Sequence, residues 1–142
     1  MNIENLYNKI LIDARNPDIF SRFIDDNLNN KIIIFLTFLS KVFNKIDKND
    51  KNYQIFFDYI FHRIETDLRE LGYGDMSVNK KMKVIVTKFY SILLDFKNFD
   101  NKNKSNRVEI LAKYFKNIKE IDEFSAMVNS YLSIDNSKLN DN

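Results

Sequence analysis

Apolar side chains recur along this chain at spacings of three and four residues, which places them on one face of an α-helix. The clearest stripe lies in residues 53–71, at Tyr53, Phe56, Phe57, Ile60, Phe61, Ile64, Leu68 and Leu71. Residues 78–97 carry a second stripe, at Val78, Met82, Ile85, Phe89, Ile92 and Phe96. The pattern predicts two long helices with one buried face each, and we expect the first of them to lie at the centre of the core.

Shorter stripes predict further helices on both sides of this pair. Residues 3–14 turn Leu6, Tyr7 and Ile10 to one face, and a second piece begins at Asn16-Pro17, because proline suits the first position of a helix. Further helices are predicted over 30–47, 106–118 and 120–133, with polar loops at 47–52 and 99–105.

The most apolar run, Ile32–Leu39, is too short to cross a bilayer and predicts a buried helix. Two glycines and one proline in 142 residues are too few for the many turns of a β-sandwich or barrel. The expected fold is therefore all-α, a single-domain bundle of about six or seven helices over residues 1–134. Residues 135–142 are polar, and we expect a frayed tail there.

Both glycines fall in one stretch, Leu71-Gly72-Tyr73-Gly74-Asp75, between the two long stripes. Their placement predicts a joint between helices whose backbone needs positive φ or close approach. Gly72 stands where a left-handed residue would end the first helix, and Asp75 or Ser77 is placed to cap the second.

Composition excludes several classes of protein. The chain has no cysteine, so disulfides, thiolate zinc sites and cysteine nucleophiles are ruled out. The net charge of +2 is small, and lysine dominates over arginine, whereas dedicated nucleic-acid-binding domains carry a dense basic surplus. We expect no DNA partner.

Few residues suggest chemistry. His62 shares a helix face with Asp58 and Glu65, but a carboxylate-bridged metal site needs a second histidine motif, and the chain has one histidine. Glu65 and Arg69 are spaced as a helix-surface ion pair. The acids Glu65, Asp67, Glu70 and Asp75 are typical of solvated faces and caps, and no phosphate-binding or dinucleotide motif is present, so we expect neither an enzyme nor a cofactor.

Two further groups leave alternatives open. Lysines crowd the start of the second long helix, at Lys80, Lys81, Lys83 and Lys88. They fit either a solvated face or contact with phosphate, from ribosomal RNA or anionic lipid. Aromatic residues outside the stripes fit either the core or an exposed groove for another helix; they are Phe43, Tyr59, Tyr90 and Phe99.

The segment from Asp67 to Val78, Asp-Leu-Arg-Glu-Leu-Gly-Tyr-Gly-Asp-Met-Ser-Val, closely resembles the signature of the ubiquinol–cytochrome c chaperone family. Lys80-Lys81-Met82-Lys83 and Phe89-Tyr90 extend the resemblance, and Ala14-Arg15-Asn16-Pro17 with Phe20 resembles the family's N-terminal Ala-Arg-x-Pro element. The likeness runs from about Leu6 to Tyr131 and is specific from Ile64 to Phe96.

The resemblance implies a non-enzymatic helical chaperone that binds newly made cytochrome b and aids assembly of the respiratory bc1 complex. It also implies partners seen in the mitochondrial branch, namely a small partner chaperone subunit and the ribosome. The N-terminus lacks the regions of a signal or transit peptide, which favours a bacterial-type, cytoplasmic protein, either free or peripheral at the inner face of the cytoplasmic membrane.

We expect the glycine joint to form, or to hold the shape of, the client-binding surface; the alternative is that it only ends one helix and starts the next. The candidate partner-binding residues are Arg15, Asp67, Arg69, Glu70, Gly72, Tyr73, Gly74, Asp75, Met76, Lys80 and Lys81. Two rival functions are an RNA- or ribosome-binding module using the lysines, and a haem-binding protein using His62.

Overall fold

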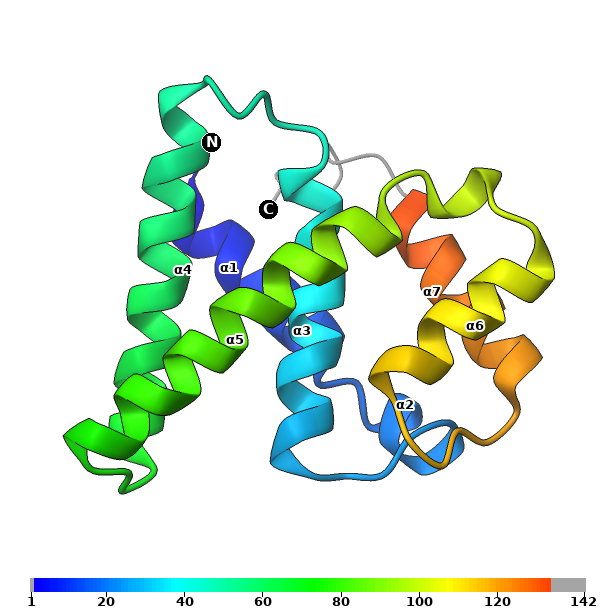
Figure 1. The fold of residues 1–142 in the computed structure, drawn as a ribbon, viewed down its shortest axis with the longest axis horizontal. Helices are drawn as coiled ribbons and strands as arrows, with labels where there is room; N and C mark the ends of the chain where they lie inside the picture. The colour runs from blue at the N-terminus through cyan, green and yellow to red at the C-terminus, as the bar shows by residue number, and fades with distance from the viewer. Residues whose placement is uncertain (1, 134–142) are drawn as a thin grey trace.

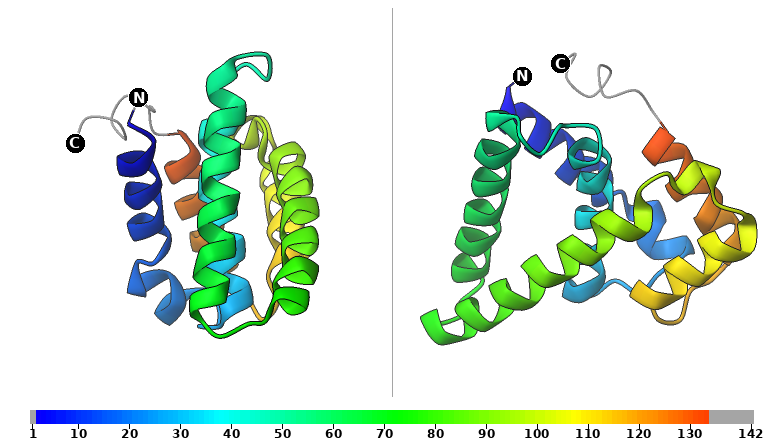
Figure 2. Two further views of the ribbon diagram at one scale, coloured as in Figure 1. Left: turned by 90° about the vertical axis from the view of Figure 1, so that its left-hand side faces the viewer. Right: turned by 45° about the horizontal axis from the view of Figure 1, so that its top comes forward.

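The helix α3 (Leu28–Phe43) lies in the middle of the molecule in the computed structural model, which describes residues 2–133. The helices α1 (Ile3–Ala14) and α5 (Asp75–Phe96) pack on opposite sides of it (Figures 1 and 2). Next to them, α4 (Lys51–Glu70) packs against α5 and α1. The α5 helix crosses in front of α3 in Figure 1.

The other elements lie at the opposite end from α4. They are α2 (Pro17–Arg22), the short 3-10 helix η1 (Phe99–Asn101), α6 (Lys104–Tyr114) and α7 (Ile121–Ser133), of which α7 packs against α3, α6 and η1. The described part of the chain holds helices and no strand, so the all-α prediction is confirmed. None of its helices is both long and apolar enough to cross a bilayer.

The prediction that residues 53–71 form the central helix is wrong, because α3 holds that place. Every residue from Ile33 to Phe43 is buried, including Thr37, Ser40 and Lys41. Thr37 and Ser40 satisfy their hydroxyls within the helix by donating to the carbonyl oxygens of Ile33 and Thr37, respectively. A helix that is apolar all round is buried all round, whereas a clear stripe marks a helix with one face in solvent.

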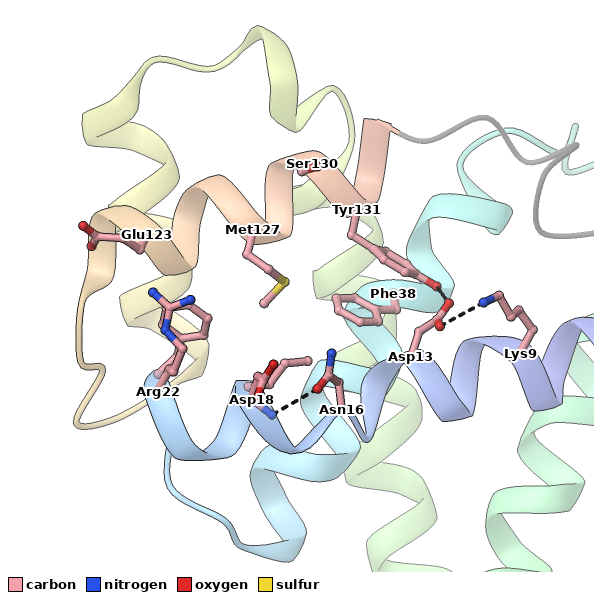
Figure 3. A pocket seen from close by; sticks show the side chains of 12 residues that line it. Lys9, Asp13, Asn16, Asp18, Arg22, Phe38, Glu123, Met127, Ser130 and Tyr131 are labelled. Atoms are coloured by element: carbon pink, nitrogen blue, oxygen red, sulfur yellow. Dashed lines mark hydrogen bonds and ion pairs between the residues drawn. The ribbon is translucent and has the colours of Figure 1, made fainter.

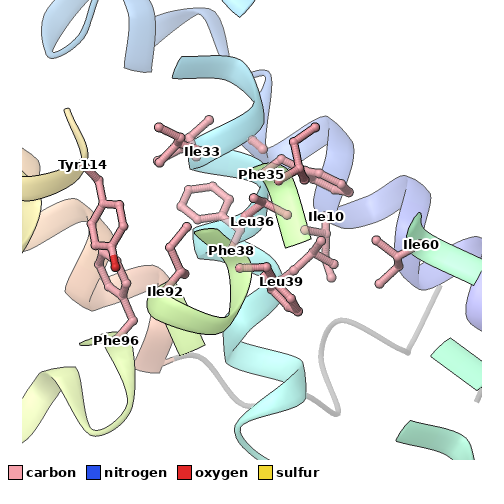
Figure 4. Close-up of a cluster of buried hydrophobic side chains, with 14 of the residues drawn as sticks. Ile10, Ile33, Phe35, Leu36, Phe38, Leu39, Ile60, Ile92, Phe96 and Tyr114 are labelled. Atoms are coloured by element: carbon pink, nitrogen blue, oxygen red, sulfur yellow. The ribbon is translucent and has the colours of Figure 1, made fainter. Parts of the chain in front are cut away.

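Figure 4 shows the core that surrounds α3. Leu36, Phe38 and Leu39 are inaccessible to solvent or nearly so. Side chains from α1, α4, α5 and α6 belong to the same buried cluster, namely Ile10, Ile60, Ile92, Phe96 and Tyr114. The apolar faces predicted for these helices are therefore the faces that build the core.

The aromatic residues outside the stripes divide between core and surface. Phe43 stacks on Phe56 with ring centroids 5.1 Å apart and meets Phe89 edge-on at 5.2 Å. Phe99 is also buried, Tyr59 is half-buried, and Tyr90 is exposed. For Phe43 and Phe99 the core alternative is confirmed.

Side-chain caps explain where several helices begin. Asn2, Asn16, Asn27, Asp50 and Asn103 each accept a hydrogen bond from a backbone N–H of the first turn, at 2.8–3.0 Å. These bonds satisfy donors that the start of a helix leaves unpaired. They place the starts of α3, α4 and α6 two residues before the starts at 30, 53 and 106 that periodicity predicts.

Two helices end earlier than predicted. The helix α3 ends at Phe43, not at 47, and the side chain of Asn44 donates to the carbonyl oxygen of Leu93 at 3.2 Å. The helix α6 ends at Tyr114, not at 118. The next residue, Phe115, is extended and buried. The predicted tail, residues 135–142, lies outside the described residues.

Candidate functional site at the α4–α5 turn and the adjoining groove

The end of α4 is closed by backbone hydrogen bonds around Gly72, which has a φ of +100°. The Gly72 N–H donates to the Arg69 carbonyl oxygen at 3.0 Å, and the Tyr73 N–H donates to the Leu68 carbonyl oxygen at 3.3 Å. This pair of bonds is a Schellman motif, in which the residue after the cap adopts a left-handed conformation. The prediction for Gly72 is confirmed.

Gly74 serves a different purpose from the one predicted. It is the N-cap of α5 with φ −75° and ψ 168°, a conformation open to any residue, and a Cβ there would meet no atom within 4 Å. The prediction that Asp75 or Ser77 caps this helix, starting it at 78, is wrong. The helix begins at Asp75, whose carboxylate stands in the first turn, where the helix dipole favours negative charge.

An ion-pair cluster, which we call the charged tip, spans the turn. It consists of Glu65, Arg69 and Asp75: the Arg69 guanidinium donates to the Glu65 carboxylate at 2.9 Å and to the Asp75 carboxylate. These two hydrogen bonds raise the pKa of Arg69. All three side chains are exposed, so the charged tip links α4 to α5 at the surface and displays one cation between two acids.

The other predicted residues of the turn differ in what surrounds them. The Lys81 ammonium lies 4.7 Å from the centroid of the half-buried Tyr73 ring, a cation–π contact within the protein. Glu70, Met76 and Lys80 are exposed. Of the predicted lysines, Lys80 and Lys83 are exposed, whereas Lys81 and Lys88 are half-buried.

A small groove, which we call the α1–α4 groove, lies beside the turn between α1, α3 and α4. Its volume is about 90 Å³. Arg15 ends α1 at one side of it, and Asp67 in the last turn of α4 also lines it. The other lining residues are mostly apolar: Tyr7, Leu11, Leu28, Lys31, Ile32, Phe35, Ile64, Leu68 and Leu71.

Leu71 connects the groove with the turn. The apolar stripe of α4 predicts a buried Leu71, but the side chain is 64% exposed. The helix ends at Glu70, and Gly72 turns the chain away, so the helical period no longer places Leu71 against the core. Leu71 therefore places exposed apolar surface beside the lining of the α1–α4 groove.

Tyr7 is the groove residue whose pKa responds to the charged groups around it. Its buried ring lies under the Arg63 guanidinium, 4.8 Å from the centroid. Burial raises the pKa of Tyr7 to about 12; the Asp67 carboxylate adds to the rise, and the guanidinium groups of Arg63 and Arg15 oppose it. The hydroxyl is therefore a neutral hydrogen-bonding group at physiological pH, set between charges of both signs.

The structure thus divides the predicted site residues into two neighbouring groups. Arg15 and Asp67 both line the α1–α4 groove, although they come from the two separate segments that carry the family resemblance. The remaining candidates belong to the turn or to the start of α5. Tyr7 and Lys31 were not among the predicted site residues, and no local pattern reveals them, because their place in the groove depends on how α1 and α3 meet α4.

A larger cavity of about 600 Å³ lies between α1–α2 and α7 (Figure 3). Phe38 and Tyr131 stack there with ring centroids 3.8 Å apart. The Tyr131 hydroxyl donates to the Asp13 carboxylate at 2.9 Å, and the Lys9 ammonium donates to it at 3.3 Å. Burial and this carboxylate raise the pKa of Tyr131. None of the predicted site residues is among the described residues that line this cavity.

The acids beside His62 already have partners. Asp58 accepts a hydrogen bond from Gln54 at 2.8 Å, and Glu65 is paired with Arg69. His62 itself is exposed. Within residues 2–133, no three His, Cys, Asp or Glu side chains are grouped so that they could hold a metal ion.

Comparison with known proteins bears on the fold and on the family. The crystal structure of the Cbp3 homolog from Brucella abortus matches 96% of this chain and 83% of its own, with a TM-score of 0.71. At 21% sequence identity this likeness shows a shared fold. None of the curated proteins matches the chain.

The family comparison covers more than half of the sequence. Residues 31–128 match the family described as ubiquinol-cytochrome C chaperone. The matched segment runs from the start of α3 into α7 and includes the whole α4–α5 turn. The chain belongs to the ubiquinol–cytochrome c chaperone family.

Proposed function

We propose that this protein is an assembly chaperone for ubiquinol–cytochrome c reductase, the bc1 complex, and that it binds newly made cytochrome b without catalysing a reaction. Its family membership supports the chaperone role. The observation that supports a client-binding surface is that Arg15 and Asp67, from two separate segments, line the same groove, the α1–α4 groove.

The chemistry of this groove suits an unassembled membrane protein. Such a client exposes apolar side chains that its partners will later cover, with scattered polar groups among them. Leu28 and Leu71 offer exposed apolar contacts, while Arg15, Lys31 and Asp67 provide charges of both signs at the same groove. A partner segment that lies along these residues buries apolar surface and pairs its own polar groups.

The direct test is capture of cytochrome b by purified variants. Asp67→Asn removes a groove charge at equal side-chain size, and Arg15→Gln removes the opposite charge while keeping a polar but shorter side chain. The matched control is Arg22→Gln with Asp122→Asn, which removes exposed charges elsewhere. We expect weaker capture by the groove variants, with unfolding curves close to those of the control. Capture equal to that of the control would place the client elsewhere.

The charged tip requires a separate measurement, because its proposed role differs from that of the groove. Arg69→Gln breaks both ion pairs of the tip, and Asp75→Asn breaks one of them. If the tip contacts the client, capture falls while the urea midpoint stays nearly constant. A loss of capture that only follows a loss of stability identifies the tip as a support for the turn.

The cellular role is tested by deleting the gene in its host. The proposal predicts loss of cytochrome b and of the bc1 complex, with other respiratory complexes retained. Purification of the native protein from such cells, complemented with a tagged copy, also reveals whether a small partner subunit accompanies it. Retention of a normal bc1 complex after deletion would overturn the proposed function.

A further inference from the structure

The solvent-facing side of α5 carries a continuous stripe of exposed residues, which we call the outer α5 face. Its members follow one another at spacings of four and three residues, with Val84 at its side, and all are exposed. They are Met76, Lys80, Lys83, Val84, Thr87, Tyr90 and Leu94. At about 1.5 Å per residue, the stripe is about 27 Å long.

This face is more apolar than a solvated helix surface requires. Met76 is 78% exposed, Val84 57% and Leu94 75%, and Tyr90 also lies open. Half of the large exposed hydrophobic side chains in the described part of the chain belong to α5. They are not needed for the core, which α5 contacts through its opposite face at Val78, Ile85, Phe89, Ile92 and Phe96.

The charge of the same segment has one sign. From Met76 to Leu94 the sequence contains four lysines and no acidic residue. The two acids of α5 lie at its ends and have partners within the protein: Asp75 is bound by Arg69, and Asp95 accepts from Lys113 at 2.8 Å. The Thr87 hydroxyl donates to the Lys83 carbonyl oxygen at 2.9 Å. Its proton is therefore already hydrogen-bonded within α5 and needs no acceptor from a partner.

We propose that the outer α5 face docks this protein on an anionic phospholipid surface. The aliphatic side chains of Met76, Val84 and Leu94 enter the boundary between headgroups and acyl chains, and Lys80 and Lys83 meet lipid phosphates. Tyr90 suits the same boundary, because it joins an apolar ring to a polar hydroxyl. The inference goes beyond the proposed function, since it concerns a surface other than the α1–α4 groove, although Met76 and Lys80 are also among the predicted partner-binding residues.

The composition of the face favours lipid over RNA as the source of phosphate. Single-stranded RNA is bound by aromatic rings on which bases stack, and by arginine planes. The outer α5 face instead offers three aliphatic side chains and lysines, with Tyr90 as its one ring. Aliphatic side chains gain free energy when they leave water for the interior of a bilayer, and they gain little by packing against stacked bases.

The test is co-sedimentation of the purified protein with phospholipid vesicles. Vesicles of phosphatidylcholine mixed with phosphatidylglycerol are compared with phosphatidylcholine alone, at low and high salt. We expect binding to the mixed vesicles, weakened by salt. The Val84→Gln, Leu94→Gln double variant should lower the partition coefficient at least about tenfold, and Lys83→Glu about fivefold or more.

The matched control is Ile12→Gln with Ile55→Gln, which removes exposed aliphatic residues from α1 and α4 and should leave vesicle binding unchanged. Failure to bind the mixed vesicles, or binding that the α5 variants do not weaken, overturns the proposal. Salt-sensitive retention on RNA without vesicle binding also overturns it, in favour of an RNA-binding face. The variants used here lie outside the α1–α4 groove, so cytochrome b capture by the same proteins reports separately on the proposed function.

Discussion

Arg15 and Asp67 shift the pKa of the same hydroxyl group, that of Tyr7, in opposite directions. Both line the α1–α4 groove, and the Asp67 carboxylate raises the pKa of Tyr7 while the Arg15 guanidinium lowers it. The two segments that carry the family resemblance are therefore coupled through a third residue, which belongs to neither of them. This coupling can be measured without a client.

The first prediction concerns the titration of Tyr7. Asp67→Asn removes a negative charge that disfavours the phenolate, so the Tyr7 pKa falls from its value of about 12; Arg15→Gln removes an opposing positive charge, so the pKa rises. Because the pKa of Tyr7 is raised in the folded protein, its contribution to stability is present below about pH 10 and is lost as pH rises toward 12. NMR titration of labelled tyrosine rings measures both shifts. Equal titration of Tyr7 in all three proteins would contradict the geometry of the groove.

The two glycines of the turn should differ in their tolerance of a side chain. Gly72→Ser forces a β-carbon into a left-handed conformation, at a cost of about 1–2 kcal/mol. Gly74→Ser is the matched change: its φ and ψ are ordinary, its Cβ has open space, and serine is a favoured N-cap, so stability stays level or rises by a few tenths of a kcal/mol. Urea unfolding of both variants distinguishes them. A larger loss for Gly74→Ser would show that the turn is built differently.

Part of the stability that the protein loses in acid should be lost through protonation of Asp95. Burial raises the pKa of this carboxyl, but hydrogen bonds from Lys113 and Tyr114 outweigh burial and leave the pKa lowered. A lowered pKa in the folded state means that the ionised group stabilises the protein above about pH 4, and that this contribution is lost as pH falls further. Asp95→Asn should therefore destabilise the protein at neutral pH, with a difference from wild type that disappears in acid.

The measurement is the free energy of unfolding across this pH range, with Asp100→Asn as a control at an exposed position. A difference between Asp95→Asn and wild type that stays constant with pH would show that the carboxylate is not held by Lys113 and Tyr114.

Two neighbouring residues on α5 test which face of the helix builds the core. Phe89 is inaccessible to solvent and meets Phe43 and Phe61 with ring centroids 5.2 Å and 5.4 Å away. Phe89→Ala should cost about 3–5 kcal/mol, because it leaves a cavity in the core. Tyr90→Ala removes an exposed ring that stacks on Phe57 at 6.0 Å, and should cost about 1 kcal/mol or less. Thermal and urea unfolding report both values, and the reverse order would be inconsistent with the fold.

Much of the local structure could be read from the chain. The spacing of apolar residues predicts the helices and their buried faces, since a period near 3.6 is a property of the helix itself. The left-handed end of α4 follows from Gly72, because glycine adopts this conformation without steric cost. The Glu65–Arg69 ion pair follows from its spacing of four residues.

The arrangement of the helices depended on contacts that no local pattern encodes. The local sequence shows a clear apolar stripe on α4 and a uniformly apolar α3. Only the packing of the helices shows that α3 lies between α1 and α5. The same packing decides that Leu71 is exposed and that Asp75 reaches Arg69.

The sequence by itself determined which segments are helical, which side of each amphipathic helix faces inward and where the glycine joint stands, because these depend on residues a few positions apart. Only the tertiary structure decided that Arg15, Tyr7 and Asp67 share one groove and that the outer face of α5 stays uncovered. The physical reason is that hydrophobic burial has no direction: each apolar face can be covered by several partners, and the choice among them is made by the packing of the whole chain.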